Sequence, residues 1–191
     1  MSRLRVLLVL FVIAAIGIGG MFVWKRVFGT TVDRRVELGG IVCDVGGKVT
    51  NTADYRSGPS PHGLVVFLDK DSTYSEKPVK DTGSEGPLRA AQRDKQIADI
   101  QLVACVDRDS EQALGRSCDF DGGTSLPVYR PRYHVRVYES KTHRKVSDQF
   151  IDAQSEAEFT CPTLYFDEGE RKIQVDPDYP ALAALLTPLV R

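Results

Sequence analysis

The chain has 191 residues, with 25 Lys and Arg against 26 Asp and Glu and a formal net charge of −1. Four of the basic residues but none of the acidic ones lie in residues 1–28, so the remainder is mildly acidic. This balance argues against nucleic-acid binding, which requires a basic patch. The remaining roughly 160 residues are enough for one domain with a core of its own.

The N-terminal part contains a long apolar run, Val6–Trp24, without a charged side chain. At about 1.5 Å per residue, a helix of this length spans a hydrocarbon core of about 30 Å. Trp24 ends the run where an interfacial aromatic residue is expected. We predict a short tail at residues 1–5 and a transmembrane signal anchor at 6–27. A cleaved signal peptide and a secreted product are the alternative. Basic residues on both sides of the run leave its orientation open: Arg3, Arg5, Lys25 and Arg26.

The segment after the anchor, residues 28–38, is short and charged and predicts a juxtamembrane stalk. The extracytoplasmic domain is then expected over residues 39–191. Two Gly pairs bracket the small apolar stretch 41–45, a pattern that favours a short strand with a turn at each end.

A continuous β-branched and aromatic run, LVVFL at residues 64–68, predicts a strand that is covered on both faces and central in a sheet. Residues 69–87 are polar, with two Pro and two Gly, and predict a mobile surface loop. Residues 88–99 combine apolar positions with helix formers and favour a short helix.

Residues 100–106 predict a second buried strand, followed by a polar turn near Gln112 and a return strand. Residues 133–151 then predict a hairpin with its turn at 141–144, because apolar and polar side chains alternate before the turn. In the last segment, Leu182, Leu185, Leu186 and Leu189 form a helical stripe. The expected fold class is α+β: an N-terminal transmembrane helix followed by a mainly antiparallel sheet packed by a C-terminal helix.

Four cysteines are the disulfide candidates: Cys43, Cys105, Cys118 and Cys161. None forms a CxxC pair, which argues against a zinc ribbon or a thioredoxin-type site. An even number of cysteines behind an export-type N-terminus favours an oxidising compartment, with buried free thiols as the alternative. Cys105 and Cys118 are expected to face each other across the predicted hairpin, and Cys118 with Cys161 is the rival pair.

A basic cluster on one predicted strand, Arg132, His134 and Arg136, is a candidate anion-binding site. A solvated strand face is the alternative. Asp-x-Asp steps at 69–71, 107–109 and 119–121 lack the further oxygen ligands of a calcium loop. No metal site, cofactor or catalytic residue is therefore predicted, and no nucleotide-binding or nucleophile-elbow motif occurs.

Residues 88–191 resemble a recurring small β-rich bacterial module. The features that carry the resemblance are PLRA at 87–90, ADIQLVACVDR at 98–108, YHVRVYESKTHRKV at 133–146 and the Cys-Pro pair at 161–162. The resemblance implies a β-rich accessory domain and assigns no functional residue.

These patterns predict a single-pass protein of the cell membrane with an extracytoplasmic, non-enzymatic binding or envelope-associated domain. Its expected partners are the membrane, through the N-terminal helix, and a protein of the envelope. A membrane-tethered hydrolase whose triad is not visible in sequence is one alternative. A membrane assembly component that faces the cytoplasm and keeps free thiols is the other.

Overall fold

The computed structural model of the chain describes residues 28–55, 61–70, 73–79, 86–93, 95–121, 123–163 and 171–191. The predicted anchor at residues 6–27 lies outside these ranges. Within them, no helix is long and apolar enough to cross a membrane.

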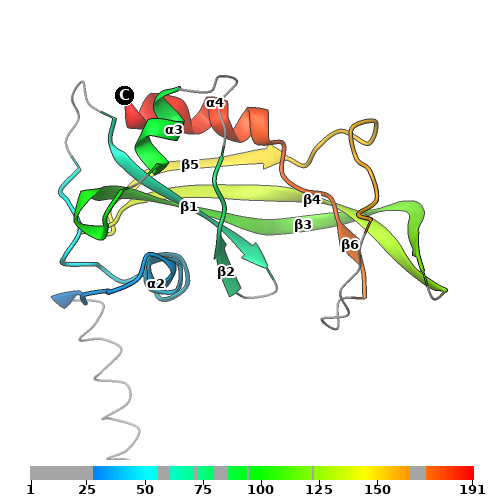
Figure 1. Cartoon of the computed structure of the whole chain (residues 1–191), viewed down its shortest axis with the longest axis horizontal. Coiled ribbons are helices and arrows are strands. Elements are labelled where there is room, and N and C mark those ends of the chain that lie inside the picture. Colours follow the sequence, from blue (N-terminus) through cyan, green and yellow to red (C-terminus); the bar gives the residue numbers. More distant parts are fainter. Residues whose placement is uncertain are drawn as a thin grey trace, which may run out of the picture.

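The described part folds into one mixed sheet with helices on both sides (Figure 1). The strands are β1 Gly63–Lys70, β2 Thr73–Glu76, β3 Ile100–Phe120, β4 Thr124–Glu139, β5 Lys145–Asp152 and β6 Ile173–Gln174. The helical elements are α2 Val36–Leu38, η1 Gly39–Val45, α3 Pro87–Gln92, η2 Ile97–Asp99 and α4 Tyr179–Val190. The predicted α+β class with a C-terminal helix is confirmed for this part of the chain.

The strand order is β2-β1-β3-β4-β5, and the short β6 pairs with the first half of β4. β1 runs parallel to β3, and β6 runs parallel to β4, whereas the other pairs are antiparallel. The apolar run predicted as a central strand is β1, which lies between β2 and β3. The predicted 133–151 hairpin is formed by β4 and β5.

Alternation along the strands gives the sheet two buried faces, because successive side chains point to opposite sides. The face under α3 and α4 includes Leu64, Val66, Leu102, Ala104, Val135 and Val137. The opposite face, under α2 and η1, includes Val65, Phe67, Val103, Cys105 and Tyr138. The sheet is therefore the middle layer, with α4 on one side and the α2–η1 segment on the other (Figure 1).

Helix α4 covers its face of the sheet as predicted. Asp178 caps it by accepting a hydrogen bond from the amide of Ala181 at 3.0 Å, which satisfies one of the free N–H groups of the first turn. Leu182 and Leu186 are fully buried, and Leu185 and Leu189 pack against the same core from its edge.

The stretch 41–45 is helical rather than a strand, so that prediction is wrong. Helix α2 continues into η1, which buries Val42 and Cys43 against the sheet. Gly39 makes this approach possible: a Cβ there would lie 2.7 Å from Cδ1 of Phe67. The second Gly pair begins with Gly46, which ends the helix in the left-handed conformation, at φ +70°.

The segment predicted as a stalk, residues 28–38, packs into the domain. Val32 and Leu38 are buried in the cluster below the sheet. Thr30 is bridged to the chain near Val49, because its amide donates to the carbonyl of Lys48 at 2.9 Å. Thr30 is thus held to the domain by backbone hydrogen bonds.

The predicted loop at 69–87 is wrong in part, because it contains strand β2. This strand pairs with β1, with Phe67 opposite Glu76 and Lys70 opposite Thr73. A polar strand forms here because β1 presents an edge whose amides and carbonyls need partners. Residues 71–72 and 80–85 of the same segment lie outside the described ranges.

The hairpin of β3 and β4 is much longer than predicted, and its turn does not lie near Gln112. β3 continues to Phe120 and turns before Thr124, so that Cys105 lies opposite Arg136 and Cys118 opposite Leu126. The polar residues that resemble a turn are accommodated by a bulge, where Gly115 adopts φ +69°. Cys105 and Cys118 therefore lie on the same strand, and the predicted bridge between them is wrong.

Candidate functional site

The four cysteines form two disulfides. Cys43–Cys105 fastens η1 to the centre of β3, and the rival pair Cys118–Cys161 fastens the outer half of β3 to the segment that follows β5. The Cα atoms are 5.6 Å apart in both pairs. Two disulfides indicate an oxidising location, extracytoplasmic or secreted.

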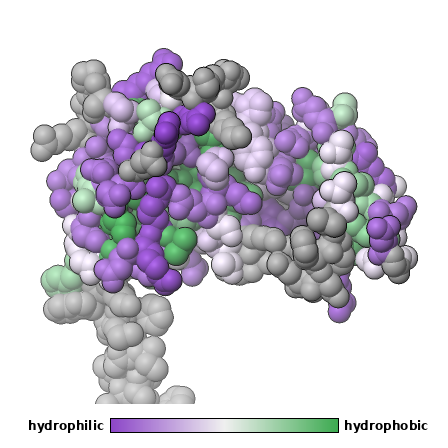
Figure 2. All heavy atoms as spheres, viewed as in Figure 1, coloured by the Kyte–Doolittle hydropathy of each residue, from purple (hydrophilic) through white to green (hydrophobic). Residues whose placement is uncertain are grey.

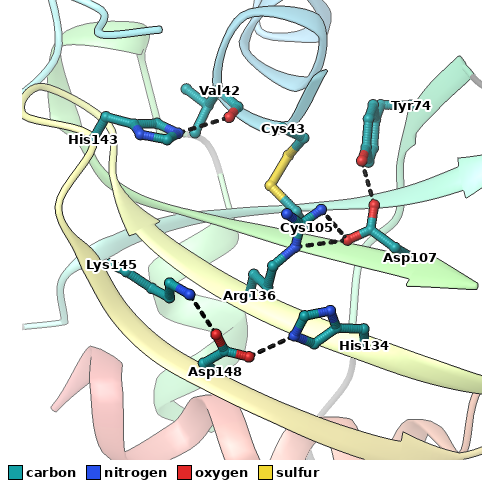
Figure 3. A network of polar contacts seen from close by, with 10 residues as sticks. All are labelled: Val42, Cys43, Tyr74, Cys105, Asp107, His134, Arg136, His143, Lys145 and Asp148. Atoms are coloured by element: carbon teal, nitrogen blue, oxygen red, sulfur yellow. Dashed lines mark hydrogen bonds and ion pairs between the residues drawn. A yellow bond between two sulfur atoms is a disulfide. The ribbon is translucent and has the colours of Figure 1, made fainter. Parts of the chain in front are cut away.

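The basic cluster predicted on β4 lies on the face of the sheet that carries η1. Arg132, His134 and Arg136 project from this face because they alternate with the buried side chains of β4. β3 and β5 flank them, and the disulfide at Cys105 lies nearby (Figure 3). We call this exposed surface the open sheet face.

Arg136 is held by a carboxylate on the neighbouring strand. Its guanidinium donates to Oδ2 of Asp107 through Nη2 at 2.6 Å and Nε at 3.1 Å. The hydroxyl of Tyr74, on β2, donates to the other oxygen of Asp107 (Figure 3). Burial, and then the hydrogen bond to Asp107, raise the pKa of Tyr74 well above its ordinary value, so this hydroxyl keeps its proton.

His134 pairs in the same way with β5. Its Nε2 lies 2.5 Å from Oδ1 of Asp148, whose other oxygen accepts from Lys145 (Figure 3). The hydrogen bonds from Lys145 and His134 lower the pKa of Asp148 to about 2. The imidazole stacks on the ring of Phe150 at 4.4 Å, and the guanidinium of Arg132 lies 4.5 Å from the centre of that ring.

The three basic side chains therefore share one face, but two of them already face a carboxylate. An external anion on this face would compete with Asp107 for Arg136 and with Asp148 for His134. The basic charges on this face are therefore largely balanced by neighbouring carboxylates. Figure 2, in the same view as Figure 1, shows mostly hydrophilic residues, with hydrophobic ones in small separate areas.

The other two histidines serve the packing of the domain. His62 is buried, with Nδ1 2.7 Å from Oε1 of Gln101 and an edge contact to the ring of Tyr55. His143, in the predicted turn at 141–144, stacks on Tyr138 and places Nε2 3.0 Å from the carbonyl oxygen of Val42 (Figure 3).

A cleft of about 220 Å³ opens on the α4 side of the sheet, where β1 and β2 end beside the β3–β4 hairpin. Its lining is Leu68, Asp69, Ser75, Lys77, Arg108, Tyr133, Arg171, Lys172, Gln174 and Asp176. Basic side chains outnumber acidic ones along this wall. The sequence contains no signal for the cleft, because its residues come from five strands and the segments beside them.

The Asp-x-Asp steps at 69–71, 107–109 and 119–121 give no candidate metal site among the described residues. Asp107 is paired with Arg136, and Asp119 and Asp121 are exposed near the end of the β3–β4 hairpin. In the ranges that the structure describes, no group of three or more His, Cys, Asp or Glu side chains is placed to hold a metal ion.

Comparison with protein-family models, curated proteins and solved structures found no match to this chain.

Proposed function

We propose that this chain is a single-pass membrane protein whose domain lies outside the cytoplasm and binds another component of the envelope. The observation that carries the proposal is the pair of disulfides, Cys43–Cys105 and Cys118–Cys161. Bonds of this kind persist in oxidising compartments and are rare in the cytosol. The apolar run Val6–Trp24 supplies the anchor.

The disulfides also bear on the orientation that the flanking charges leave open. A domain that needs two disulfides belongs on the oxidising side, which puts Arg3 and Arg5 in the cytoplasm. This orientation agrees with the positive-inside rule for Arg3 and Arg5, before the apolar run. It goes against the rule for Lys25 and Arg26, after the run, which it places outside the cytoplasm.

The charged side chains of the open sheet face and of the cleft near Lys77 support binding rather than catalysis. On the open sheet face, acidic and basic side chains alternate in short-range pairs, as Asp107 with Arg136 and Asp148 with His134. Such a face is suited to a protein partner with complementary charges. The ion pairs on the face are already oriented, and polar groups of the partner would replace the water around them. The cleft near Lys77 offers a second, more basic surface.

The location is tested with thiol chemistry on the full chain in spheroplasts. The Ala184→Cys variant adds one thiol on the exposed side of α4. A membrane-impermeant maleimide is expected to modify this variant once without lysis, and the wild type only after reduction and unfolding. Modification of A184C only after lysis, or of wild-type cysteines without reductant, would contradict the extracytoplasmic location and favour the assembly component that faces the cytoplasm.

The binding role is tested separately with the purified full chain. Charge-reversed Arg136→Glu and Lys77→Glu variants are compared in crosslinking to envelope proteins, with Lys141→Glu as the control for an exposed charge. We expect one specific crosslinked product to be lost in R136E or in K77E and to be kept in K141E. Hydrolysis of an ester or peptide that one of these substitutions abolishes would instead favour the tethered hydrolase.

A further inference from the structure

We infer that the α2 side of the domain is held directly against the surface of the bilayer. This inference rests on the proposed anchor. It follows from the length of chain between the apolar run and the folded domain, and it assigns lipid headgroups as the occupant of a surface around Phe28, Arg34 and Val36.

The tether is short. The apolar run ends at Trp24, and Thr30 is already bonded to the domain, because its carbonyl accepts from the amide of Thr50 at 2.8 Å. Six peptide steps, fully extended, span at most about 20 Å. Part of that length is taken up by the headgroup layer, which is about 5–8 Å thick on each side of the hydrocarbon core.

The domain cannot release more chain without losing its core on this side. Val32, Leu38 and Val42 are buried under the sheet, and Val49 completes the same cluster. The Cys43–Cys105 bridge fixes the helix that follows to the central strand. Unwinding residues 30–38 to form a stalk would take Val32 and Leu38 out of this cluster and expose them to water, which opposes such a release.

The side that faces the bilayer is set by where the tether enters. Phe28 to Thr30 and the α2–η1 helix lie on the side of the sheet opposite α4 (Figure 1). Of the large hydrophobic side chains that are strongly exposed in the described part, two belong to this short segment: Phe28 is 58% and Val36 is 53% exposed. The side chain of Arg34, between them, is 75% exposed.

Aromatic, apolar and Arg side chains together are typical of the boundary between headgroups and water. The surface has no net positive charge, because Arg34 pairs with Glu37 at 2.9 Å and Asp44 is exposed further along the helix. Contact is therefore imposed by the tether rather than by attraction to anionic lipid. The open sheet face lies on the α2 side and is turned toward the bilayer with it, whereas the cleft near Lys77 is on the α4 side and stays accessible to a partner. Of the two proposed binding surfaces, this inference therefore favours the cleft.

The test uses the full chain in phosphatidylcholine vesicles with its disulfides oxidised. An environment-sensitive fluorophore is attached to Val36→Cys, and in a matched variant to Ala184→Cys on α4. With a spin label on the lipid headgroup, we expect quenching at position 36 to exceed quenching at position 184 by at least about threefold. An anionic lipid such as phosphatidylglycerol is expected to leave this ratio unchanged.

A second variant distinguishes contact that is imposed by the short tether from contact that is due to affinity for lipid. About twenty Gly and Ser residues inserted between Val27 and Phe28 add a flexible reach of about 25 Å. Quenching at position 36 is then expected to fall to the level at position 184. Equal quenching at both positions without the insertion, or no change with it, would overturn the inference while leaving the anchor intact. A chain that does not float with the vesicles would overturn the proposed anchor itself.

Discussion

At the scale of single residues, Asp107 connects three strands of the sheet. It accepts from Tyr74 on β2 and from Arg136 on β4, while its own backbone lies in β3. The side chains of Asp107 and Arg136 are only 18% and 29% exposed. In this partly buried ion pair, two N–H groups of the guanidinium donate to one carboxylate oxygen. It contributes more to stability than an exposed pair, because removal of one member leaves the other partly buried without its partner.

We predict that Asp107→Asn lowers the free energy of unfolding by about 1–2 kcal/mol. The amide keeps one acceptor but loses the charge that holds Arg136, and its NH₂ group cannot accept from Tyr74. Urea unfolding followed by circular dichroism measures the change. Asp54→Asn is the control, because the Lys141–Asp54 pair is exposed and its loss is expected to cost less than about 0.5 kcal/mol. Equal effects in the two variants would contradict a special contribution of Asp107.

At the scale of elements, the α2–η1 helix depends on one close contact. Gly39 faces Phe67 and Tyr74 on the sheet, whereas Gly40 has nothing within 4 Å of the position of a Cβ. Both residues are helical, so the two glycines differ in packing rather than in backbone conformation. They form a natural pair of test positions.

We predict opposite effects of alanine at these two positions. Gly39→Ala is expected to destabilise the protein by about 1–3 kcal/mol, because the new methyl group overlaps the aromatic ring of Phe67. Gly40→Ala is expected to be neutral or to stabilise by up to about 1 kcal/mol, because alanine favours the helix. Thermal and urea unfolding of both variants measure the difference. The same sign for both substitutions would show that the helix does not approach the sheet as described.

At the scale of the whole molecule, the two disulfides stabilise different regions. The body contains the part of β3 that pairs with β1, together with the β4–β5 hairpin. Beyond it, the outer hairpin from Ser110 to Pro131 pairs mainly within itself, with β6 added at Val128 and Tyr129. Cys43–Cys105 lies in the body, and Cys118–Cys161 lies in the outer hairpin.

We predict that removing each bridge has a different local signature. The pairs are separated by 62 and 43 residues, so loop-closure entropy gives each bridge about 4 kcal/mol at most. Cys43→Ala with Cys105→Ala is expected to lower global stability. Cys118→Ala with Cys161→Ala is expected mainly to speed amide exchange in the outer hairpin. Hydrogen exchange read by mass spectrometry distinguishes the two, and uniform acceleration in both double variants would contradict the division.

Much of this architecture is determined by the sequence alone. The continuous apolar runs at 64–68 and 100–106 predict strands buried on both faces. The alternation from Tyr133 to Tyr138 and the leucine stripe of α4 predict which face is buried, because periodicity is a local property of the chain. The same alternation places Arg132, His134 and Arg136 on one face. The even number of cysteines likewise indicates the compartment.

Only the tertiary structure decided which segments meet. The helix at Gly39–Val45 forms because a glycine can approach Phe67, and β3 continues through a polar stretch because β4 pairs with it residue by residue. Cys118 reaches Cys161 rather than Cys105, and Arg136 meets Asp107, through contacts between residues far apart in the chain. Local propensity cannot specify such contacts, since they depend on strand register and on the packing of the whole domain.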